Sequence, residues 1–468
     1  MIRLYNTLTA RREPFVPIEE GKVKMYACGP TVYNFFHVGN ARCFVIFDML
    51  RRYFEYRGYE VTFVQNFTDI DDKVIRRANE EGVDYTEIAD RYIREYFTDA
   101  KGLGVRPATV HPHATENMDT ILGIVSGLVA KGYAYPMDGD VYFRTRKFGG
   151  YGKLSGQAIE DLESGARIDV NDKKEDPLDF ALWKAAKPGE PFWPSPYGEG
   201  RPGWHIECSA MVRRYLGKTI DIHCGGQDLI FPHHENEIAQ SECCNGAPFA
   251  NFWLHNGYIN IDNRKMSKSL GNFFTVREVA EKYGYLPIRY FLLSSHYRSP
   301  INFSEEVIGQ AKAALERIFN CAEKLDFYVK NAEGELRADE AEMLSAFRKT
   351  REDMIEGMDD DFNTGAGIAA IFDLVALINK AIGSGASLAL AKEGQALLTE
   401  MTELFGFVRE NDADAELVAW IEERIAARAA AKKEKNYAAA DAIRAELAER
   451  GVTLRDTSQG TTYTIEKK

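Results

Sequence analysis

The sequence lacks several features that would set it apart from ordinary folded proteins. It has no internal repeat and no low-complexity segment, and no stretch approaches the roughly 18 apolar residues of a membrane span. Met1–Glu20 shows no apolar run followed by a small-residue cleavage site. We therefore expect a cytoplasmic protein that does not contact a membrane.

Cysteine is sparse and odd in number. The 7 cysteines in 468 residues are Cys28, Cys43, Cys208, Cys224, Cys243, Cys244 and Cys321. Without a secretory signal a disulfide framework is not expected, so reduced thiols or metal ligands are predicted. Cys243 and Cys244 are adjacent and cannot form a Cys-x-x-Cys clip, so burial is expected for both.

An excess of positive charge is also absent. With 58 Lys+Arg against 71 Asp+Glu the formal net charge is −13, which argues against a nucleic-acid partner. However, residues 421–468 hold ten basic and eight acidic residues, a balance of +2, which leaves −15 for the first 420. A local basic surface can bind a polyanion even on an acidic molecule.

The first third of the chain has the pattern of a nucleotide-binding sheet. Lys22–Cys28 is a predicted strand that ends at Gly29, Ala41–Tyr53 has helical periodicity, and Tyr59–Asn66 alternates like a second strand. This β–loop–α–β order is typical of a parallel sheet.

The rest of the chain suggests further domains, as a length beyond roughly 200 residues leads one to expect. Residues 110–202 resemble an insertion; Thr219–His223 and Phe252–Tyr258 resume the strand pattern around a helix-like Pro232–Cys244. Helical periodicity follows from Ser304, Ala426–Arg450 is helix-prone, and the tail is β-like. We predict an α/β protein with these domains: 1–110 and 203–250, a Rossmann-type catalytic domain; 111–202, an inserted connective domain; 251–310, a loop region; 311–400, a helix bundle; and 401–468, a small C-terminal domain.

Two motifs are suited to phosphate. His37-Val38-Gly39-Asn40 lies at a predicted helix start, where backbone N–H groups attract anions and Gly39 permits close approach. The alternative is a helix-capping turn with a structural histidine. Lys265-Met266-Ser267-Lys268-Ser269 suits a clamp on a triphosphate, where charge grows in the transition state. Its alternative is a solvated basic loop.

Four residues have the chemistry of metal ligands: Cys28, Cys208, His233 and Glu237. Pro232 suits a first helical position, so His233 and Glu237, four residues apart, are expected on one helical face. Because loops at the carboxyl ends of parallel strands converge, Cys28 need not be near Cys208 in sequence. Two thiolates, an imidazole and a carboxylate make a plausible Zn²⁺ site. Taken singly, the alternatives are a surface hydrogen bond for the His–Glu pair and a small buried thiol for either cysteine.

The pairing of His-Val-Gly-Asn with Lys-Met-Ser-Lys-Ser resembles the class I aminoacyl-tRNA synthetases. The resemblance implies that His37, Gly39 and Asn40 bind ATP and that Lys265 and Lys268 stabilise the transition state. Asn40 departs from the family-wide histidine in a way known for the cysteine branch. The strings around the metal candidates and Asn66–Lys73 are similar to cysteinyl-tRNA synthetases over about residues 2–465.

That resemblance implies one zinc ion per chain on Cys28, Cys208, His233 and Glu237, joined by the substrate's thiolate. It also implies an amino-acid pocket of Thr68, Trp204 and His223, with Asp228 near the amino or adenosine end. Cys224 departs from the family's glycine and is interpreted as a packing residue. His113 stands where the family has arginine, which leaves that arginine's role in doubt.

The implied reaction uses L-cysteine, ATP with Mg²⁺, and tRNA(Cys). Zinc can separate cysteine from serine, a distinction that a pocket of fixed shape makes poorly. The resemblance further implies that the C-terminal domain binds the anticodon, with Lys432, Lys433 and Lys435 as phosphate contacts or simply a solvated face. A monomer is expected. The competing interpretations are a cysteine ligase with an amino-sugar acceptor and a catalytically inactive homologue.

Overall fold

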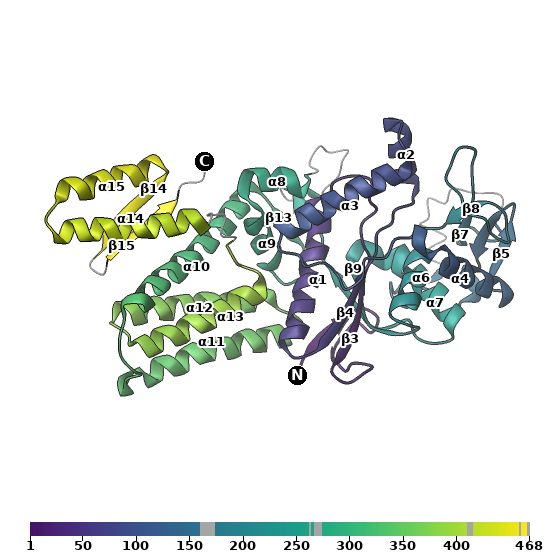
Figure 1. The fold of residues 1–468 in the computed structure, drawn as a ribbon. Helices are drawn as coiled ribbons and strands as arrows, with labels where there is room; N and C mark the ends of the chain where they lie inside the picture. The colour runs from purple at the N-terminus through teal and green to yellow at the C-terminus, as the bar shows by residue number, and fades with distance from the viewer. Residues whose placement is uncertain (160–173, 262–263, 266–273, 410–414, 458–459, 466–468) are drawn as a thin grey trace. The chain divides into compact units, whose positions relative to one another are not determined.

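The computed structural model describes residues 1–159, 174–261, 264–265, 274–409, 415–457 and 460–465. The chain divides into two compact units (Figure 1). One unit comprises Met1–Leu315 with Asp353–Ala369, and the other comprises Glu316–Glu352 with Ala370–Lys468. Each is described by itself.

The first unit is built on a parallel sheet in the order β10-β9-β3-β4. Its strands are β3 (Lys22–Ala27), β4 (Glu60–Gln65), β9 (Ile220–Gly226) and β10 (Ala250–Asn256), and α1 (Val38–Tyr56) connects β3 to β4. The expected β–α–β unit and parallel sheet are thus confirmed. Ala27 pairs with both Gln65 and Cys224, so the carboxyl ends of the strands meet at one edge. Ligands of open α/β sheets bind at that edge.

An antiparallel sheet lies in the inserted region, in the order β5-β6-β7-β8. It consists of β5 (Ala134–Met137), β6 (Asp140–Phe143), β7 (Phe180–Ala185) and β8 (Gly200–Pro202). The helix α4 (Met118–Ala130) precedes it and packs against α6 (Ile206–Tyr215) and α7 (Glu235–Asn245). The sequence pattern did not indicate α4, because its two glycines and several β-branched residues disfavour a helix outside a packed core.

The remaining elements of the first unit flank the parallel sheet. They are the hairpin β1 (Arg3–Asn6) and β2 (Arg11–Pro14), the helices α2 (Asp72–Glu81), α3 (Tyr85–Gly102), α8 (Val276–Tyr283) and α9 (Tyr285–Leu293), and a small sheet of β11 (Ile259–Ile261), β12 (Arg264–Lys265) and β13 (Ile301–Phe303). In that sheet β11 pairs with both other strands.

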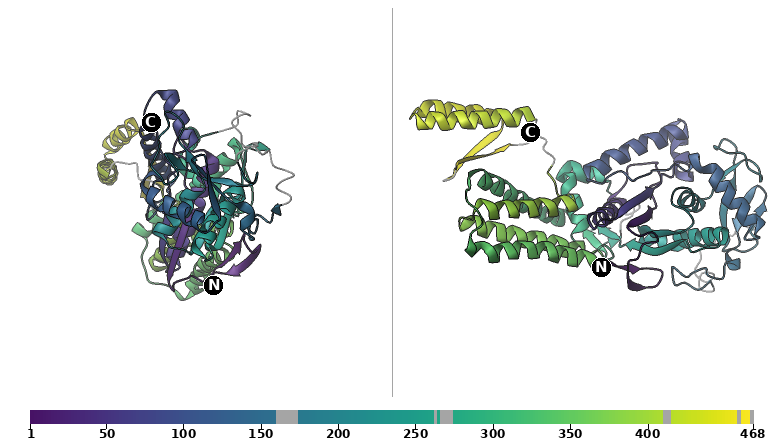
Figure 2. Two further views of the ribbon diagram at one scale, coloured as in Figure 1. Left: turned by 90° about the vertical axis from the view of Figure 1, so that its right-hand side faces the viewer. Right: turned by 60° about the horizontal axis from the view of Figure 1, so that its bottom comes forward.

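Four long helices follow: α10 (Glu305–Asn331), α11 (Ala341–Asp359), α12 (Thr364–Gly383) and α13 (Leu388–Phe405) (Figure 2). After them come α14 (Ala415–Lys433), α15 (Tyr437–Glu449) and the hairpin of β14 (Val452–Thr457) and β15 (Gly460–Ile465), which share a small core of Ile421, Leu447, Val452 and Leu454. The helical region expected over Ala426–Arg450 is two helices. Lys435 has a φ of 60°, and the side chain of Asn436 caps α15 by accepting from the Ala439 N–H.

One expectation about long apolar segments is corrected. Among the described residues, α12 is long and apolar enough to cross a membrane, with a mean hydropathy of 1.7 over its best window. This is weak evidence, because a core helix passes the same test. Ile371, Leu374 and Ile378 of α12 are buried.

Candidate metal centre and active site

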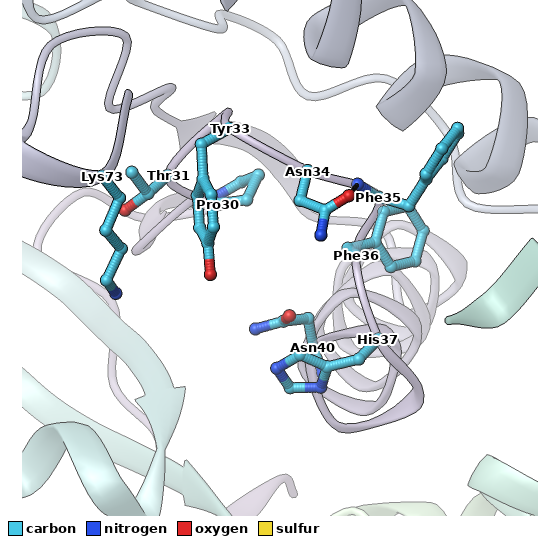
Figure 3. A pocket seen from close by; sticks show the side chains of 9 residues that line it. All are labelled: Pro30, Thr31, Tyr33, Asn34, Phe35, Phe36, His37, Asn40 and Lys73. Atoms are coloured by element: carbon cyan, nitrogen blue, oxygen red, sulfur yellow. Dashed lines mark hydrogen bonds between the residues drawn. The ribbon is translucent and has the colours of Figure 1, made fainter. Parts of the chain in front are cut away.

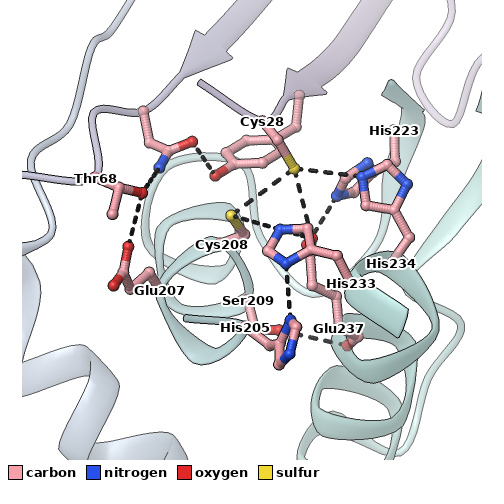
Figure 4. Close-up of polar contacts among 12 residues, drawn as sticks. Cys28, Thr68, His205, Glu207, Cys208, Ser209, His223, His233, His234 and Glu237 are labelled. Carbon is pink, nitrogen blue, oxygen red and sulfur yellow. Dashed lines mark hydrogen bonds and ion pairs between the residues drawn. The ribbon is translucent and has the colours of Figure 1, made fainter. Parts of the chain in front are cut away.

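Cys28, Cys208, His233 and Glu237 meet in one buried cluster that could hold a metal ion (Figure 4). Each offers one ligand atom, and these atoms all lie within 4.8 Å of one another. The two sulfurs are 3.9 Å apart, and His233 Nε2 lies 3.7 Å from Cys208 Sγ and 3.0 Å from Glu237 Oε1. The chain therefore brings together four donors from three separate segments, which hold Cys28, Cys208 and the stretch His233–Glu237.

The sheet edge explains how these segments meet. Cys28 directly follows β3, and Cys208 lies in the first turn of α6. A Cβ atom on Gly29 would lie 1.5 Å from the Asn66 carbonyl oxygen, so only glycine lets the ends of β3 and β4 approach this closely. Phe231 has extended dihedrals, and the helical backbone runs from Pro232 through His234 into α7, which is assigned from Glu235, so the expected helical start at Pro232 is confirmed. His233 and Glu237 lie four residues apart on this stretch, and their ligand atoms meet.

Burial and mutual contacts set the protonation of the four candidate ligands. Burial raises the pKa of Cys28 well above its usual value, whereas the hydrogen bond with Cys28 lowers that of Cys208 to about 6. Burial alone would raise the pKa of Glu237, but His223 and His233 lower it to about 2. Burial opposes protonation of His233, yet Glu237 and Cys208 raise its pKa to about 10. In the metal-free cluster Cys208 and Glu237 are therefore anionic, and His233 carries the positive charge that faces them.

Two further histidines, His223 and His234, lie against the same cluster. Cys28, His223, His234 and Glu237 also have ligand atoms within 4.8 Å of one another. His223 Nε2 is 2.9 Å from Glu237 Oε2, and His234 Nε2 is 3.4 Å from Cys28 Sγ. Burial lowers the pKa of His234 well below its usual value, so its ring is neutral. His234 was missed in the sequence, where only its place beside His233 hinted at it.

Three predicted pocket residues surround this cluster in different ways. Thr68 is buried, and its hydroxyl donates to Glu207 Oε2 at 3.0 Å. Trp204 is 43% exposed and stacks on His233 with ring centroids 4.3 Å apart. His223 is fully buried and stacks on Trp253, and its Nδ1 has no hydrogen-bond partner among the described residues. Glu207 was not singled out from the sequence; burial raises its pKa well above the usual range.

The other residues noted in the sequence lie apart from the four ligands. Cys224 follows His223 on β9 and is fully buried, and it belongs to neither metal-binding group found among the described residues. Its location supports the packing interpretation. Asp228 is exposed in the short turn Gln227–Leu229, and a Cβ on Gly226 would lie 2.4 Å from its Oδ1. His113 Nδ1 lies 3.8 Å from Asp69 Oδ2.

The predicted ATP motif occupies the start of α1. His37 caps this helix, its Nδ1 accepting from the Asn40 N–H at 3.2 Å, so in the neutral ring Nε2 carries the proton. Capping therefore uses Nδ1 and not Nε2. Val38 donates its N–H to the Phe274 carbonyl, and His37 forms a β-bridge with Thr275. Lys268 and the side chain of Lys265 lie outside the part of the chain that the structure describes. The backbone of Lys265 pairs with that of Asn260.

A cavity of about 140 Å³ lies against this helix start (Figure 3). The phosphate-motif residues His37 and Asn40 form one wall, and the ammonium of Lys73 lies 5.6 Å from the Tyr33 ring on another. The cavity is lined by Pro30, Thr31, Tyr33, Asn34, Phe35, Phe36, His37, Asn40 and Lys73. Tyr33 and Lys73 were within strings noted in the sequence but had no predicted role.

Three family models match successive parts of the chain. The model described as the tRNA synthetases class I (C) catalytic domain matches residues 14–313. A DALR domain matches residues 353–409, and a cysteinyl-tRNA ligase anticodon-binding domain matches residues 414–463.

Relatives and solved structures agree with these matches. The chain is 56% identical to the cysteine–tRNA ligase of Clostridioides difficile over 460 residues, covering 98% of this chain and 99% of that protein. It is 55% identical to the cysteine–tRNA ligase of Caldicellulosiruptor saccharolyticus, covering 98% and 99%. The methionyl-tRNA synthetase of Mycobacterium tuberculosis in complex with methionyl-adenylate shares the fold, with a TM-score of 0.59 at 18% identity over 82% of this chain and 90% of that one. The chain therefore belongs to the cysteine–tRNA ligases, which are class I aminoacyl-tRNA synthetases.

Proposed function

We propose that the chain activates L-cysteine with ATP to cysteinyl-adenylate and then transfers the cysteinyl group to the 3′ terminal adenosine of tRNA(Cys). We further propose that Zn²⁺ on Cys28, Cys208, His233 and Glu237 selects the substrate. The observation that carries this selection is the buried meeting of two thiols, an imidazole and a carboxylate within 4.8 Å.

The donor set fits zinc. Thiolate, imidazole and carboxylate are the ligands that Zn²⁺ takes in proteins. Because the pKa values of Cys208 and Glu237 are low, both side chains are anionic at neutral pH and can balance the charge of a divalent cation. When bound there, Zn²⁺ would favour the thiolate of cysteine over the hydroxyl of serine, because a thiol ionises far more readily. Trp204 and Thr68 would enclose the amino acid beside the ligands.

The ATP side of the reaction depends on positioning. The Nε2 proton of His37 and the side-chain amide of Asn40 would donate to phosphate oxygens, while Gly39 leaves room for the triphosphate and its Mg²⁺. Lys265 and Lys268 would stabilise the charge that grows as a carboxylate oxygen of cysteine attacks the α-phosphorus and pyrophosphate leaves. Asp228 would lie at the amino or adenosine end. No protein nucleophile is needed, since the carboxylate itself attacks.

In the second step a ribose hydroxyl of the tRNA attacks the carbonyl carbon of the adenylate, and AMP leaves. By their resemblance, residues 1–110 and 203–250 would carry the chemistry, 111–202 would form the connective domain, 251–310 would carry the lysine motif, and the bundle (311–400) and C-terminal domain (401–468) would hold the tRNA. The monomeric state and the cytoplasmic location stay predictions.

The zinc proposal is tested by comparing Cys208→Ser with Cys243→Ser. Both cysteines are buried, but Cys243 belongs to neither metal-binding group. We expect Cys208→Ser to lose bound zinc and at least about 100-fold of cysteine-dependent ATP–pyrophosphate exchange, since loss of a ligand weakens the metal at least as much as loss of its neighbours. Cys243→Ser should keep both. Zinc is measured by atomic absorption after dialysis. A Cys208→Ser protein without zinc but with full exchange would refute the selection by metal.

Two further measurements separate the alternatives. Cysteine-dependent exchange without tRNA charging would favour a small acceptor, and the absence of both would indicate an inactive homologue. Charging with cysteine but not serine, abolished by chelation and restored by Zn²⁺, is the expected result.

A further inference from the structure

Arg42 is a buried cation whose partners are all backbone carbonyls. It lies on α1, five residues after His37, and is fully buried. Nη1 donates to the carbonyls of Gly257 and Tyr258, each at 2.8 Å. Nη2 donates to Ser299 at 2.6 Å, Tyr297 at 3.1 Å and His296 at 3.5 Å. None of the carboxylates described in the structure forms an ion pair with it.

These five carbonyls belong to the two segments that lead into a pair of strands. Residues 257–258 connect β10 to β11, and residues 296–299 directly precede β13. The two strands run parallel, with Ile259 opposite Ile301. On its other side β11 pairs with β12, where Asn260 is opposite Lys265. Arg42 therefore joins α1 to the small sheet that carries Lys265.

A second buried arginine shows what a purely structural arrangement looks like. Arg289 is also fully buried against α1, but it pairs with Asp48 at 3.0 Å. Among the described residues no carboxylate pairs with Arg42, and the partners found for it are carbonyl dipoles, which stabilise a cation less than a carboxylate does. The planar guanidinium of Arg42 has donors in fixed directions, so it constrains the relative positions of the carbonyls that accept from it. An apolar contact imposes no such constraint.

We infer that Arg42 is a positioning residue for cysteine activation, which sets the strand pair β11–β12 relative to the helix start at His37 and Asn40. The inference rests on the proposed function, because that function assigns both the helix start and the strand pair β11–β12 to binding of the triphosphate. The helix start also meets the chain after the lysine motif where the Val38 N–H donates to the Phe274 carbonyl, and Arg42 adds the contacts that fix the entrance of β11 against the same helix. Misplacement by about 1 Å costs on the order of 100-fold in rate.

The test compares Arg42→Gln and Arg42→Lys with Arg289→Lys. In cysteine-dependent ATP–pyrophosphate exchange, we expect kcat to fall about 100-fold for Arg42→Gln and about tenfold for Arg42→Lys, with KM for ATP and cysteine changed less than about threefold. A loss confined to kcat means that transition-state contacts are affected more than substrate binding. Zinc content should stay at the wild-type value. Arg289→Lys should lower Tm but leave kcat within about twofold of wild type.

A second variant moves the carbonyls and keeps Arg42. A Cβ on Gly257 would lie 2.6 Å from the Arg298 carbonyl oxygen and 2.7 Å from that of Ser299, so Gly257→Ala should push the two strand entrances apart. It should reproduce the fall in kcat. If Arg42→Gln does not fold, Arg42→Lys and Gly257→Ala decide.

Unchanged kcat in Arg42→Lys and Gly257→Ala overturns the inference, as does an equal fall in Arg289→Lys. These outcomes differ from failure of the proposed function itself, which would appear as no cysteine-dependent exchange in the wild-type protein.

Discussion

His223 and Cys224 are neighbours on β9, yet their side chains serve different surroundings. Successive residues of a strand point to opposite faces of the sheet. His223 faces the metal cluster, where its Nε2 lies 2.9 Å from Glu237 Oε2. Cys224 faces away from it, and burial beside Cys43 raises its pKa well above the usual range. The strand thus offers a residue beside the candidate metal cluster and an internal control one position apart.

We predict that His223→Asn weakens zinc binding by about 10–100-fold, because residues that orient a metal ligand contribute on that scale. Asparagine places its amide near the former Nδ1 and loses the contact with Glu237. His223→Gln, whose amide can reach the Nε2 position, should restore most of the affinity. Zinc affinity is measured by competition with a chromophoric chelator.

Cys224→Ala serves as the control and should bind zinc like the wild type. Equal affinities of His223→Asn and wild type would show that Glu237 needs no support from this histidine.

Single residues also show what sequence reasoning can reach. The four candidate ligands were found because each belongs to a string that resembles a known family. His234, Glu207 and Arg42 were not singled out, because the contacts described above join them to residues 139 to 257 positions away in the chain. Such contacts are fixed by the fold as a whole.

At the scale of elements, the corner between α11 and α12 shows how the segment Asp353–Ala369 joins the first unit. Asp361 is fully buried and accepts from the Tyr5 N–H at 2.8 Å and from Arg298 Nη2 at 2.6 Å. Its φ of 60° is left-handed, so the chain turns sharply here. The adjacent Asp360 instead forms an ion pair with Arg12 on the surface, its side chain 59% exposed.

This pair gives a prediction about stability. Asp361→Asn should lower the free energy of unfolding of the first unit by about 3 kcal/mol, because it leaves a partly buried arginine without its partner. Asp360→Asn should cost at most about 1 kcal/mol, as exposed ion pairs do. Urea unfolding followed by tryptophan fluorescence suits this test, since Trp183, Trp193, Trp204 and Trp253 all lie in this unit. Similar losses in both variants would contradict the argument.

The contribution of Asp361 to stability should also depend on pH. Burial would raise the pKa of Asp361, but hydrogen bonds from His296, Tyr5 and Arg298 hold it below its usual value. A carboxyl whose pKa is lower in the folded state stabilises the protein fully above its unfolded pKa of about 3.9. This contribution declines as the pH falls below that value. The gap between wild type and Asp361→Asn should therefore be constant near neutral pH and shrink in acid.

The elements themselves were predictable where periodicity and packing agree. The expected strands at Lys22–Cys28 and Tyr59–Asn66 differ from β3 and β4 by only one residue at each mismatched end. The helix α4 and the break at Lys435 were not predicted. The first depends on packing against α6 and α7, and the second on a single left-handed residue followed by a capping asparagine.

At the scale of the whole molecule, the C-terminal elements differ from the rest of the chain in both charge and packing. The C-terminal elements α14, α15, β14 and β15 have their own small core. Residues 421–468 carry +2, against −15 for the residues before them. Lys432 forms an ion pair with Asp456 at 3.0 Å, whereas Lys433 and Lys435 are exposed. Of the three lysines expected to contact phosphate, the latter two are therefore the better candidates.

We predict that removing residues 410–468 separates the two steps of the reaction. Cysteine-dependent pyrophosphate exchange should stay within about twofold of the full chain, because the ATP motifs and metal cluster all lie before residue 316. The kcat/KM for tRNA charging should fall at least tenfold, equivalent to about 1.4 kcal/mol of lost binding. Lys433→Gln with Lys435→Gln in the full chain should reduce charging in the same direction and flatten its dependence on salt, since each phosphate contact releases counterions. Both measurements use purified tRNA at two salt concentrations. Charging that survives the truncation would place tRNA recognition in the other parts of the chain, and a loss of exchange would mean that this domain also supports the catalytic unit.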